Sequence, residues 1–318
     1  MKLSLLFPEV ENVDRAVDRI VQLEGLGFHS AMMGHAFGFD PITVFALAGQ
    51  RTERILLTTA VVPTHTRHPI GMAMGAATAQ AASGGRFRLG IGPSHLPIVE
   101  HVYGLSYEKP VRHMKEYLKV VRDLLHDGQT KVEGEVYRVQ AQHRVEGAAP
   151  VPVMMSALGE QMCRLAGQAS DGAIPWLAPV DYIRDTVVPS VRVGAERAGR
   201  PAPPVIAETA CVLCEDPAEV LETVRREMGF YLAMPAYRAL FDRAGLGPVD
   251  EKLVEGWTAE LIDAVIPWGT PDQIGQVIEA YFAAGADEVA LSPVGVGSDP
   301  SGSYEKTLEV LGEIARSG

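Results

Sequence analysis

Histidines and hydroxyl residues follow several apolar runs of this sequence. His35 comes after AMMG, Thr64 and His65 come after ILLTTAVVP, and His95 comes after LGIGPS. An imidazole can give or take a proton near neutral pH, and a hydroxyl can hydrogen-bond a ligand. If each run is a strand of a parallel barrel, these side chains meet at the carboxyl ends of the strands, where barrel enzymes carry their chemistry.

A metal centre is the alternative interpretation of these histidines. Metal-binding barrels normally add carboxylates at strand ends, and the nearest one here, Asp40, lies beyond His35 in the following segment. Cys211 and Cys214 have CxxC spacing but lie in a strand-like run, which places them on opposite faces. They also lack further ligands. We therefore expect neither a metal site nor a redox cysteine pair.

A second candidate site is the turn Ser156-Ala157-Leu158-Gly159. It lies between the apolar run VPVMM and a helical pattern, so small residues would present backbone N–H groups at a helix N-terminus. Such groups attract anions, which predicts a phosphate site. The same spacing is also typical of a plain helix cap.

The elements that must position these residues alternate regularly along the chain. Eight strands are predicted, at 3–7, 29–33, 55–62, 86–91, 151–155, 172–176, 205–213 and 288–291. Helical patterns follow at 13–26, 41–51, 69–82, 111–126, 159–169, 180–198, 217–232, 271–284 and 304–315. This alternation predicts an α/β fold, a (β/α)8 TIM barrel, with a doubly wound sheet as the runner-up.

One domain spanning 1–318 is expected, interrupted by three long connections near 93–110, 128–150 and 234–257. Connections of this length in a compact barrel usually form lids, subdomains or binding loops.

Composition limits the partners of the protein. The 318 residues carry a formal net charge of -12, which disfavours nucleic acid and anionic membrane surfaces. No apolar run approaches the length of a membrane span, and the first residues lack the apolar stretch of a signal peptide. Three cysteines suggest a reducing compartment. We expect a cytoplasmic enzyme that acts on a small molecule.

The sequence resembles the bacterial luciferase-like monooxygenase superfamily, and within it the oxidoreductases that use coenzyme F-420, a 5-deazaflavin. The resemblance rests on TTAVVPTHTRHP, GGRFRLGIGPSH, SALGEQMCRLAG, DGAIPW and the closing GTPDQIGQVIEAYFAAGADEVALSPVG. It implies a barrel with insertions, a cofactor ring at the carboxyl ends of the strands and hydride transfer at C5 of the ring. An FMN-dependent monooxygenase and a non-catalytic flavin-binding protein are the alternatives.

The resemblance also implies residue roles. His35 and His95 fall near catalytic positions of similar enzymes, although His95 lies where these carry an acidic residue. A non-prolyl cis peptide at Ala60–Val61 would form a bulge that supports the ring, and a homodimer through the second and third helices is implied. The residues implied to contact the cofactor are Ala60, Val61, Thr64, His65, Gly92, Ser156, Ala157, Leu158, Gly159 and Trp176.

Overall fold

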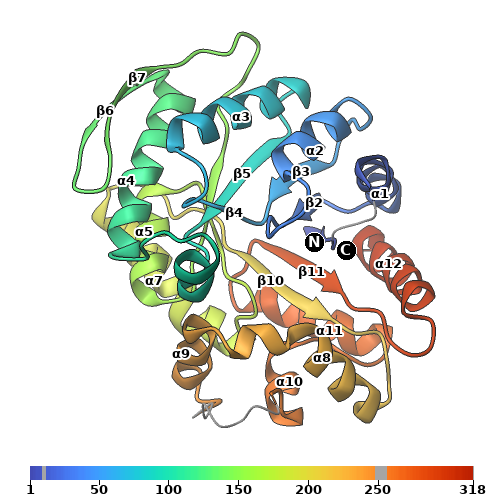
Figure 1. Ribbon diagram of the computed structural model, residues 1–318. Coiled ribbons are helices and arrows are strands. Elements are labelled where there is room, and N and C mark those ends of the chain that lie inside the picture. The colour runs from blue at the N-terminus through green and yellow to red at the C-terminus, as the bar shows by residue number, and fades with distance from the viewer. Residues whose placement is uncertain (9–11, 248–255, 318) are drawn as a thin grey trace.

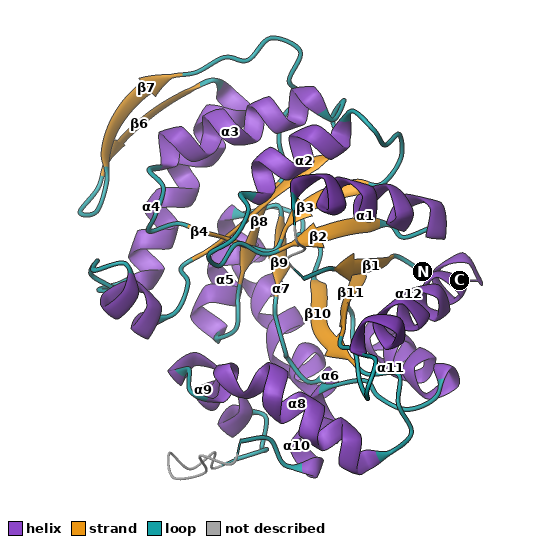
Figure 2. Cartoon of the chain, turned by 45° about the vertical axis from the view of Figure 1, so that its right-hand side comes forward, coloured by secondary structure: helices purple, strands orange, loops and turns teal. Residues whose placement is uncertain are grey.

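A computed structural model describes residues 1–8, 12–247 and 256–317. Within them, eight parallel strands form a nearly closed barrel surrounded by helices (Figures 1 and 2). The strands are β1 (Leu3–Leu6), β2 (Ser30–Met33), β3 (Leu56–Thr59), β5 (Phe87–Gly92), β8 (Val153–Ser156), β9 (Gly172–Ile174), β10 (Ile206–Cys211) and β11 (Glu288–Pro293). They pair in the order β10-β11-β1-β2-β3-β5-β8-β9. The predicted TIM barrel is confirmed, and a doubly wound sheet is excluded.

The barrel closes between β9 and β10. Parallel bridges join Ala173 to Val205 and Trp176 to Glu208 across this seam. The N–H of Leu177 donates to the Glu208 carbonyl at 2.8 Å, and the N–H of Glu208 donates to the Pro175 carbonyl at 3.0 Å. Both backbone groups of Glu208, its N–H and its carbonyl, are therefore bonded across this seam.

The helices begin and end where their sequences carry capping signals. Asn12 caps α1 by accepting from the N–H of Arg15, and α1 ends at Gly27, whose φ of 91° suits glycine. Thr270 and Gln273 form a capping box at α11. The helices are α1 (Val13–Leu26), α2 (Pro41–Gly49), α3 (Pro69–Ala82), α4 (Pro110–Arg122), α5 (Glu160–Ala169), α6 (Val180–Tyr182), α7 (Val188–Arg197), α8 (Pro217–Leu232), α9 (Pro235–Arg243), α10 (Ala259–Val265), α11 (Pro271–Ala283) and α12 (Pro300–Ser317).

The third predicted strand, 55–62, is divided in the structure. It forms β3 and a short β4 (Val62–Pro63), separated at a cis peptide bond between Ala60 and Val61. Both β3 and β4 pair with β5, and the N–H of Ala60 donates to the Met33 carbonyl at 2.8 Å. The cis bond implied by the family resemblance is present at the residues expected.

The three long connections differ in structure. Residues 93–110 include a π-helical turn, Ile98–Val102, and 128–150 include an antiparallel hairpin of β6 (Gln129–Glu133) and β7 (Arg138–Gln142). The hairpin lies at the outer edge of the molecule in Figure 1. The region 234–257 contains α9, and its residues 248–255 lie outside the described part of the chain. Sequence patterns did not predict the hairpin, α9 or α10.

The barrel interior is layered. Near the amino ends of the strands, Arg88 donates through both Nη atoms to the carboxylate of Glu288, each at 2.8 Å. Ser4 donates to the same carboxylate at 2.6 Å, and Arg88 Nε donates to Thr58 at 2.7 Å. Above this polar layer lies an apolar one, made of Met32, Met154, Ile174, Ile206 and Ala290. The carboxyl ends of the strands then surround an open space.

Candidate functional site

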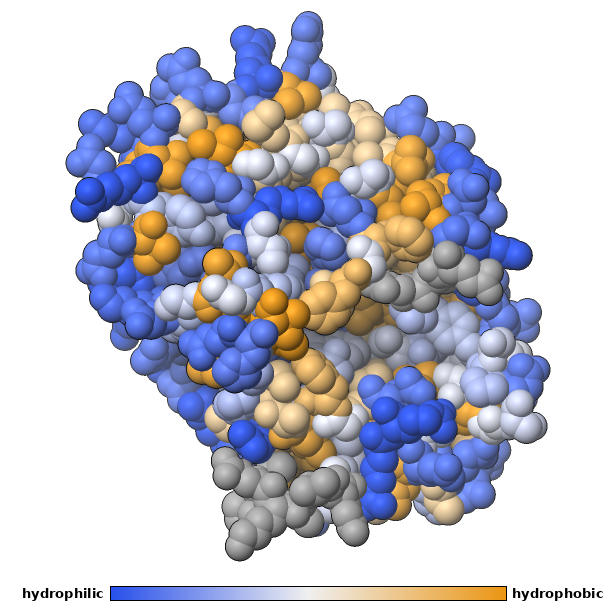
Figure 3. All heavy atoms as spheres, in the orientation of Figure 1, coloured by the Kyte–Doolittle hydropathy of each residue, from blue (hydrophilic) through white to orange (hydrophobic). Residues whose placement is uncertain are grey.

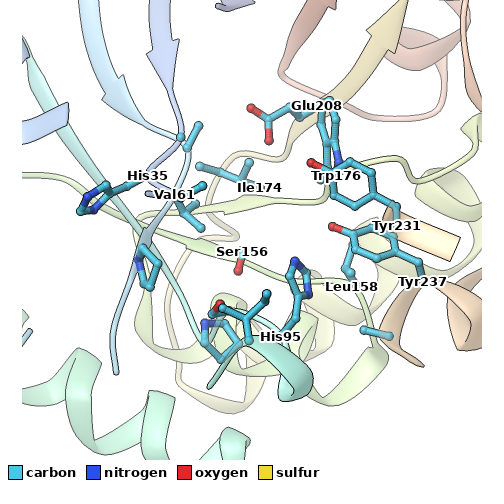
Figure 4. Close-up of a pocket in the computed structure, with 18 of the residues that line it drawn as sticks. His35, Val61, His95, Ser156, Leu158, Ile174, Trp176, Glu208, Tyr231 and Tyr237 are labelled. Carbon is cyan, nitrogen blue, oxygen red and sulfur yellow. The ribbon is translucent and has the colours of Figure 1, made fainter. Parts of the chain in front are cut away.

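A cavity of about 560 Å³ occupies the carboxyl end of the barrel. Strands β1, β2, β4, β8, β9, β10 and β11 contribute residues to its wall, from Leu6 on β1 to Ser292 on β11. The remaining wall comes from the segments that follow β1, β2, β3, β5, β8 and β9, and from α5, α8 and α9. Figure 4 shows side chains from these elements pointing toward one space. A cavity of this size in this place is the usual form of a small-molecule site in a barrel.

Most of the predicted site residues line this cavity. They are His35, Ala60, Val61, His95, Ser156, Ala157, Leu158, Gly159 and Trp176. Thr64, His65 and Gly92 lie outside its lining. Their roles in binding a cofactor stay predictions.

Thr64 and His65 face α4. The Thr64 hydroxyl lies 2.9 Å from Nε2 of His113, and its N–H donates to the Gly92 carbonyl at 2.9 Å. The His65 ring stacks on His113 with ring centroids 4.2 Å apart and planes 3° apart. These contacts attach the segment after β4 to the outer helix layer.

Gly92 has no side chain, and this absence lets the neighbouring strands pack closely. A Cβ at this position would collide with the Ser156 hydroxyl and with the Val61 side chain. Glycine therefore lets β4, β5 and β8 approach closely at the cavity wall. This is a steric requirement, and it explains the glycine without any contact to a ligand.

The two candidate catalytic histidines lie apart on the cavity wall (Figure 4). His35 lies on the side of Val61. His95 packs against the rings of Phe230 and Tyr237, with centroid distances of 6.0 and 5.7 Å. Burial lowers the pKa of His95, so its imidazole is neutral at pH 7 and can accept a proton.

Sequence reasoning missed a second group of wall residues. Glu208 lies within β10, Tyr231 on α8 and Tyr237 on α9, and Figure 4 shows them together with Trp176. Burial raises the pKa of Tyr231 to about 12, with the nearby Glu208 adding to the shift. A glutamate inside the apolar run IAETAC was a usable signal, because a carboxyl on the inner face of a buried strand has few structural reasons to exist.

A smaller hollow adjoins the cavity at the N-terminus of α5. The two share Gly159 and Met162, and the hollow also contains Arg164 and Arg243. Gly159 is the N-cap and supplies no side-chain hydrogen bond to the first turn of α5. Glu160 is paired with Arg164 along the helix. Since Glu160 occupies the Arg164 guanidinium, the backbone N–H groups of the helix start and the Arg243 guanidinium are the groups that suit a phosphate.

The described residues hold no group of three or more His, Cys, Asp or Glu side chains arranged for a metal ion. All three cysteines are free; Cys211 is buried in β10, and Cys214 donates to Glu219 at 3.3 Å. None of the described helices is both long and apolar enough to cross a membrane.

The fold and the cavity define a (β/α)8 barrel with an apolar cavity at the carboxyl ends of its strands. The family model for luciferase-like monooxygenases matches residues 4–288, and the chain belongs to this family. The chain is 26% identical to a 5,10-methylenetetrahydromethanopterin reductase of Methanolobus tindarius over 292 residues, covering 86% of each protein.

Two solved structures show the same fold. One is an F-420-dependent secondary alcohol dehydrogenase in complex with an F-420–acetone adduct, with a TM-score of 0.81, 18% identity and coverage of 98% of this chain and 97% of the other. The other is the oxygenating constituent of 3,6-diketocamphane monooxygenase from Pseudomonas putida, in complex with FMN. Its TM-score is 0.73, at 18% identity and coverage of 99% and 97%.

Proposed function

We propose that this protein is a coenzyme F-420-dependent oxidoreductase, which transfers a hydride between C5 of the deazaflavin and a small organic substrate. The observation that carries the proposal is the pair of adjoining spaces at the strand ends. The larger one has an apolar wall of suitable size for a flat ring, and the smaller one combines a helix N-terminus with Arg164 and Arg243. This division matches a cofactor with a flat ring and a phosphate on its side chain.

The residues present fit such a cofactor. The segment Ala60–Val61 forms one wall of the cavity, and Gly92 leaves room for Val61 and Ser156 to lie close together beneath a ring. Residues Ser156 to Gly159 and Arg243 would hold the phosphate. Bound there, a deazaflavin supplies hydride chemistry and reacts poorly with oxygen.

The protein residues would bind and orient the cofactor and the substrate, and they would exclude water. His35 and His95 stand at the wall with imidazoles that can hold or move a proton at the substrate oxygen while the hydride moves. The rings of Tyr231 and Tyr237 lie opposite His35 in Figure 4, and the ring of Phe230 also lines the cavity. The relatives named as F-420-dependent support this choice of cofactor.

The nearest rival is an FMN-dependent monooxygenase, because neighbours of the same fold bind FMN. The test is a fluorescence titration of the purified chain with oxidised coenzyme F-420 and, in parallel, with FMN. We expect tight saturation by F-420 and weak binding of FMN. Preference for FMN would instead identify the rival, and binding of neither would overturn both.

Arg243 provides a matched variant for this titration. Arg243→Gln removes a cation from the hollow, so we expect the F-420 dissociation constant to rise roughly tenfold. Arg197→Gln, at the exposed last turn of α7, is the control and should leave the constant unchanged. An unchanged constant in Arg243→Gln would show that the phosphate lies elsewhere.

We also infer a cytoplasmic homodimer. The free cysteines suit a reducing compartment, which cell fractionation would test. The α2 and α3 helices pack together and expose Leu47 and Met74, which are 48% and 52% exposed. Exposed apolar residues on two packed helices suit contact with a second copy of the chain.

A further inference from the structure

Glu208 lies at the floor of the cavity. Its backbone is fixed in the β9–β10 seam, and its side chain faces inward, two residues after Ile206 of the apolar layer. The residue is only 4% exposed, and it contributes to the cavity wall. Figure 4 shows the carboxyl beside Trp176 and Tyr231.

The carboxyl has little within the protein to bind. Its Oε1 atom is buried and has no hydrogen-bond partner among the described residues. No lysine or arginine lines the cavity over the described ranges. The nearby arginine of the barrel interior, Arg88, directs both Nη atoms to Glu288. A buried polar atom left unbonded costs free energy, so in native proteins it commonly serves a ligand.

We propose that the Glu208 carboxyl recognises the ligand, by hydrogen bonding an uncharged carbonyl or hydroxyl oxygen at the floor of the cavity. Two sources offer this chemistry: a carbonyl of the cofactor ring, and the oxygen of the substrate. The inference rests on the proposed function, since it requires a ring-bearing cofactor or its substrate in this space.

The protonation state of Glu208 makes it a donor. Burial raises its pKa well above the usual range, and the negative Glu288 adds to the shift. The other titratable groups facing it are Tyr231 on α8 and Tyr237 on α9, and Glu208 in turn contributes to raising their pKa values. A neutral carboxylic acid has an O–H that can donate to a ligand oxygen.

The same surroundings select the ligand by charge. An anionic substrate group would meet no cation in the cavity and would lose its hydration without compensation. We therefore infer that the substrate is uncharged where it enters the cavity, as an alcohol, ketone or enone is.

Infrared difference spectroscopy of the full chain tests this directly. A protonated carboxylic acid has a C=O stretching band that carboxylates lack, and we expect it at pH 7 in the wild-type protein and its absence in Glu208→Gln. Glu133→Gln, on the exposed hairpin, is the matched control and should keep the band. A missing band in the wild-type protein would overturn the inference.

Ligand additions then identify the source of the oxygen. A shift of the band on adding oxidised F-420 assigns the hydrogen bond to the cofactor. A shift only when cyclohexanone is added to the F-420-loaded protein assigns it to the substrate. A band unmoved by both, in a protein that fluorescence shows to be loaded, would overturn the inference and leave the proposed function intact. Failure to load F-420 would instead count against the proposed function.

Affinity gives a second measurement. Glu208→Leu removes the donor, and we expect the dissociation constant of the ligand that shifts the band to rise roughly tenfold. Glu208→Gln keeps an N–H donor and should stay within about threefold. Circular dichroism verifies that both variants are folded. Equal affinities in folded Leu and Gln variants would contradict the inference.

Discussion

At the scale of single residues, the two cavity histidines have different surroundings. His95 is enclosed by aromatic rings from α8 and α9, and burial lowers its pKa, whereas His35 lies across the cavity beside Val61. A neutral His95 can take a proton at pH 7. The His95 ring becomes protonated only below neutral pH, because its pKa is lowered. We therefore expect its contribution to turnover to be constant from pH 7 to pH 8 and to decline as the pH falls through that pKa.

Substitution of these histidines separates an enzyme from a cofactor-binding protein. We expect His35→Gln or His95→Gln to lower turnover by roughly 10²- to 10⁴-fold, the usual contribution of general acid–base catalysis, with the F-420 dissociation constant within about threefold. The measurement is the steady-state rate over a pH series, together with the fluorescence titration. His101→Gln, in the exposed part of the connection after β5, is the control. Full turnover in both cavity variants would remove the proton-transfer role.

The residue scale is also where prediction from sequence was least complete. His35, His95 and the turn 156–159 could be found because they follow apolar runs, and strand ends meet in a barrel. Glu208 was missed because it lies inside a strand and does not follow one. Thr64 and His65 do follow a strand but lie outside the cavity lining, because they contact His113 on α4. Their position after a strand could not reveal this contact.

At the scale of elements, α2 and α3 are helices with apolar residues on their outer surfaces. Hydrophobic residues are also seen scattered between polar ones on the face shown in Figure 3. Leu47 on α2 and Met74 on α3 are each about half exposed in the described part of the chain.

The proposed dimer predicts the effect of a charge at this place. Met74→Glu puts a carboxylate into the interface, so we expect sedimentation velocity to show a monomer where the wild-type chain shows a dimer. Val136→Glu makes the same change at an exposed apolar residue of the hairpin and should leave the dimer intact. A wild-type monomer, or a Met74→Glu dimer, would contradict the proposed interface.

Element boundaries followed well from local patterns, and the exceptions have physical causes. The spans 13–26, 69–82 and 217–232 were predicted to the residue because asparagine, proline or aspartate marks the start of each helix. The hairpin was missed because its strands, QTKVE and RVQAQ, hold few apolar residues and pack only on the outer helix layer, against α3 and α4. The division of the third strand depends on backbone geometry at Ala60–Val61, which hydrophobic periodicity does not encode.

At the scale of the whole molecule, the Arg88–Glu288 pair connects β5 to β11 across the barrel. Although burial acts to raise the pKa of Glu288, the hydrogen bonds and charge of Arg88 outweigh it, and the pKa is lowered. A lowered pKa in the folded state stabilises the fold above the ordinary carboxyl range, and this contribution disappears as the pH falls through the folded-state value.

Removal of the arginine tests this contribution. Arg88→Met leaves Glu288 buried without its cation, so we expect the free energy of unfolding at pH 7 to fall by about 3–5 kcal/mol. Urea denaturation followed by tryptophan fluorescence and by circular dichroism measures it, and coincident curves would support the proposed single domain. Arg184→Met breaks an exposed pair and is the control. Equal stability of wild type and Arg88→Met would show that the pair contributes nothing.

The helix α9 contacts both spaces of the site. Tyr237 faces the larger cavity and Arg243 the smaller hollow, although the helix has only nine residues. An exchange of this one segment between relatives would therefore alter substrate choice and cofactor retention together, while leaving the barrel strands untouched. Under the proposed function, neither property could be changed through α9 without affecting the other.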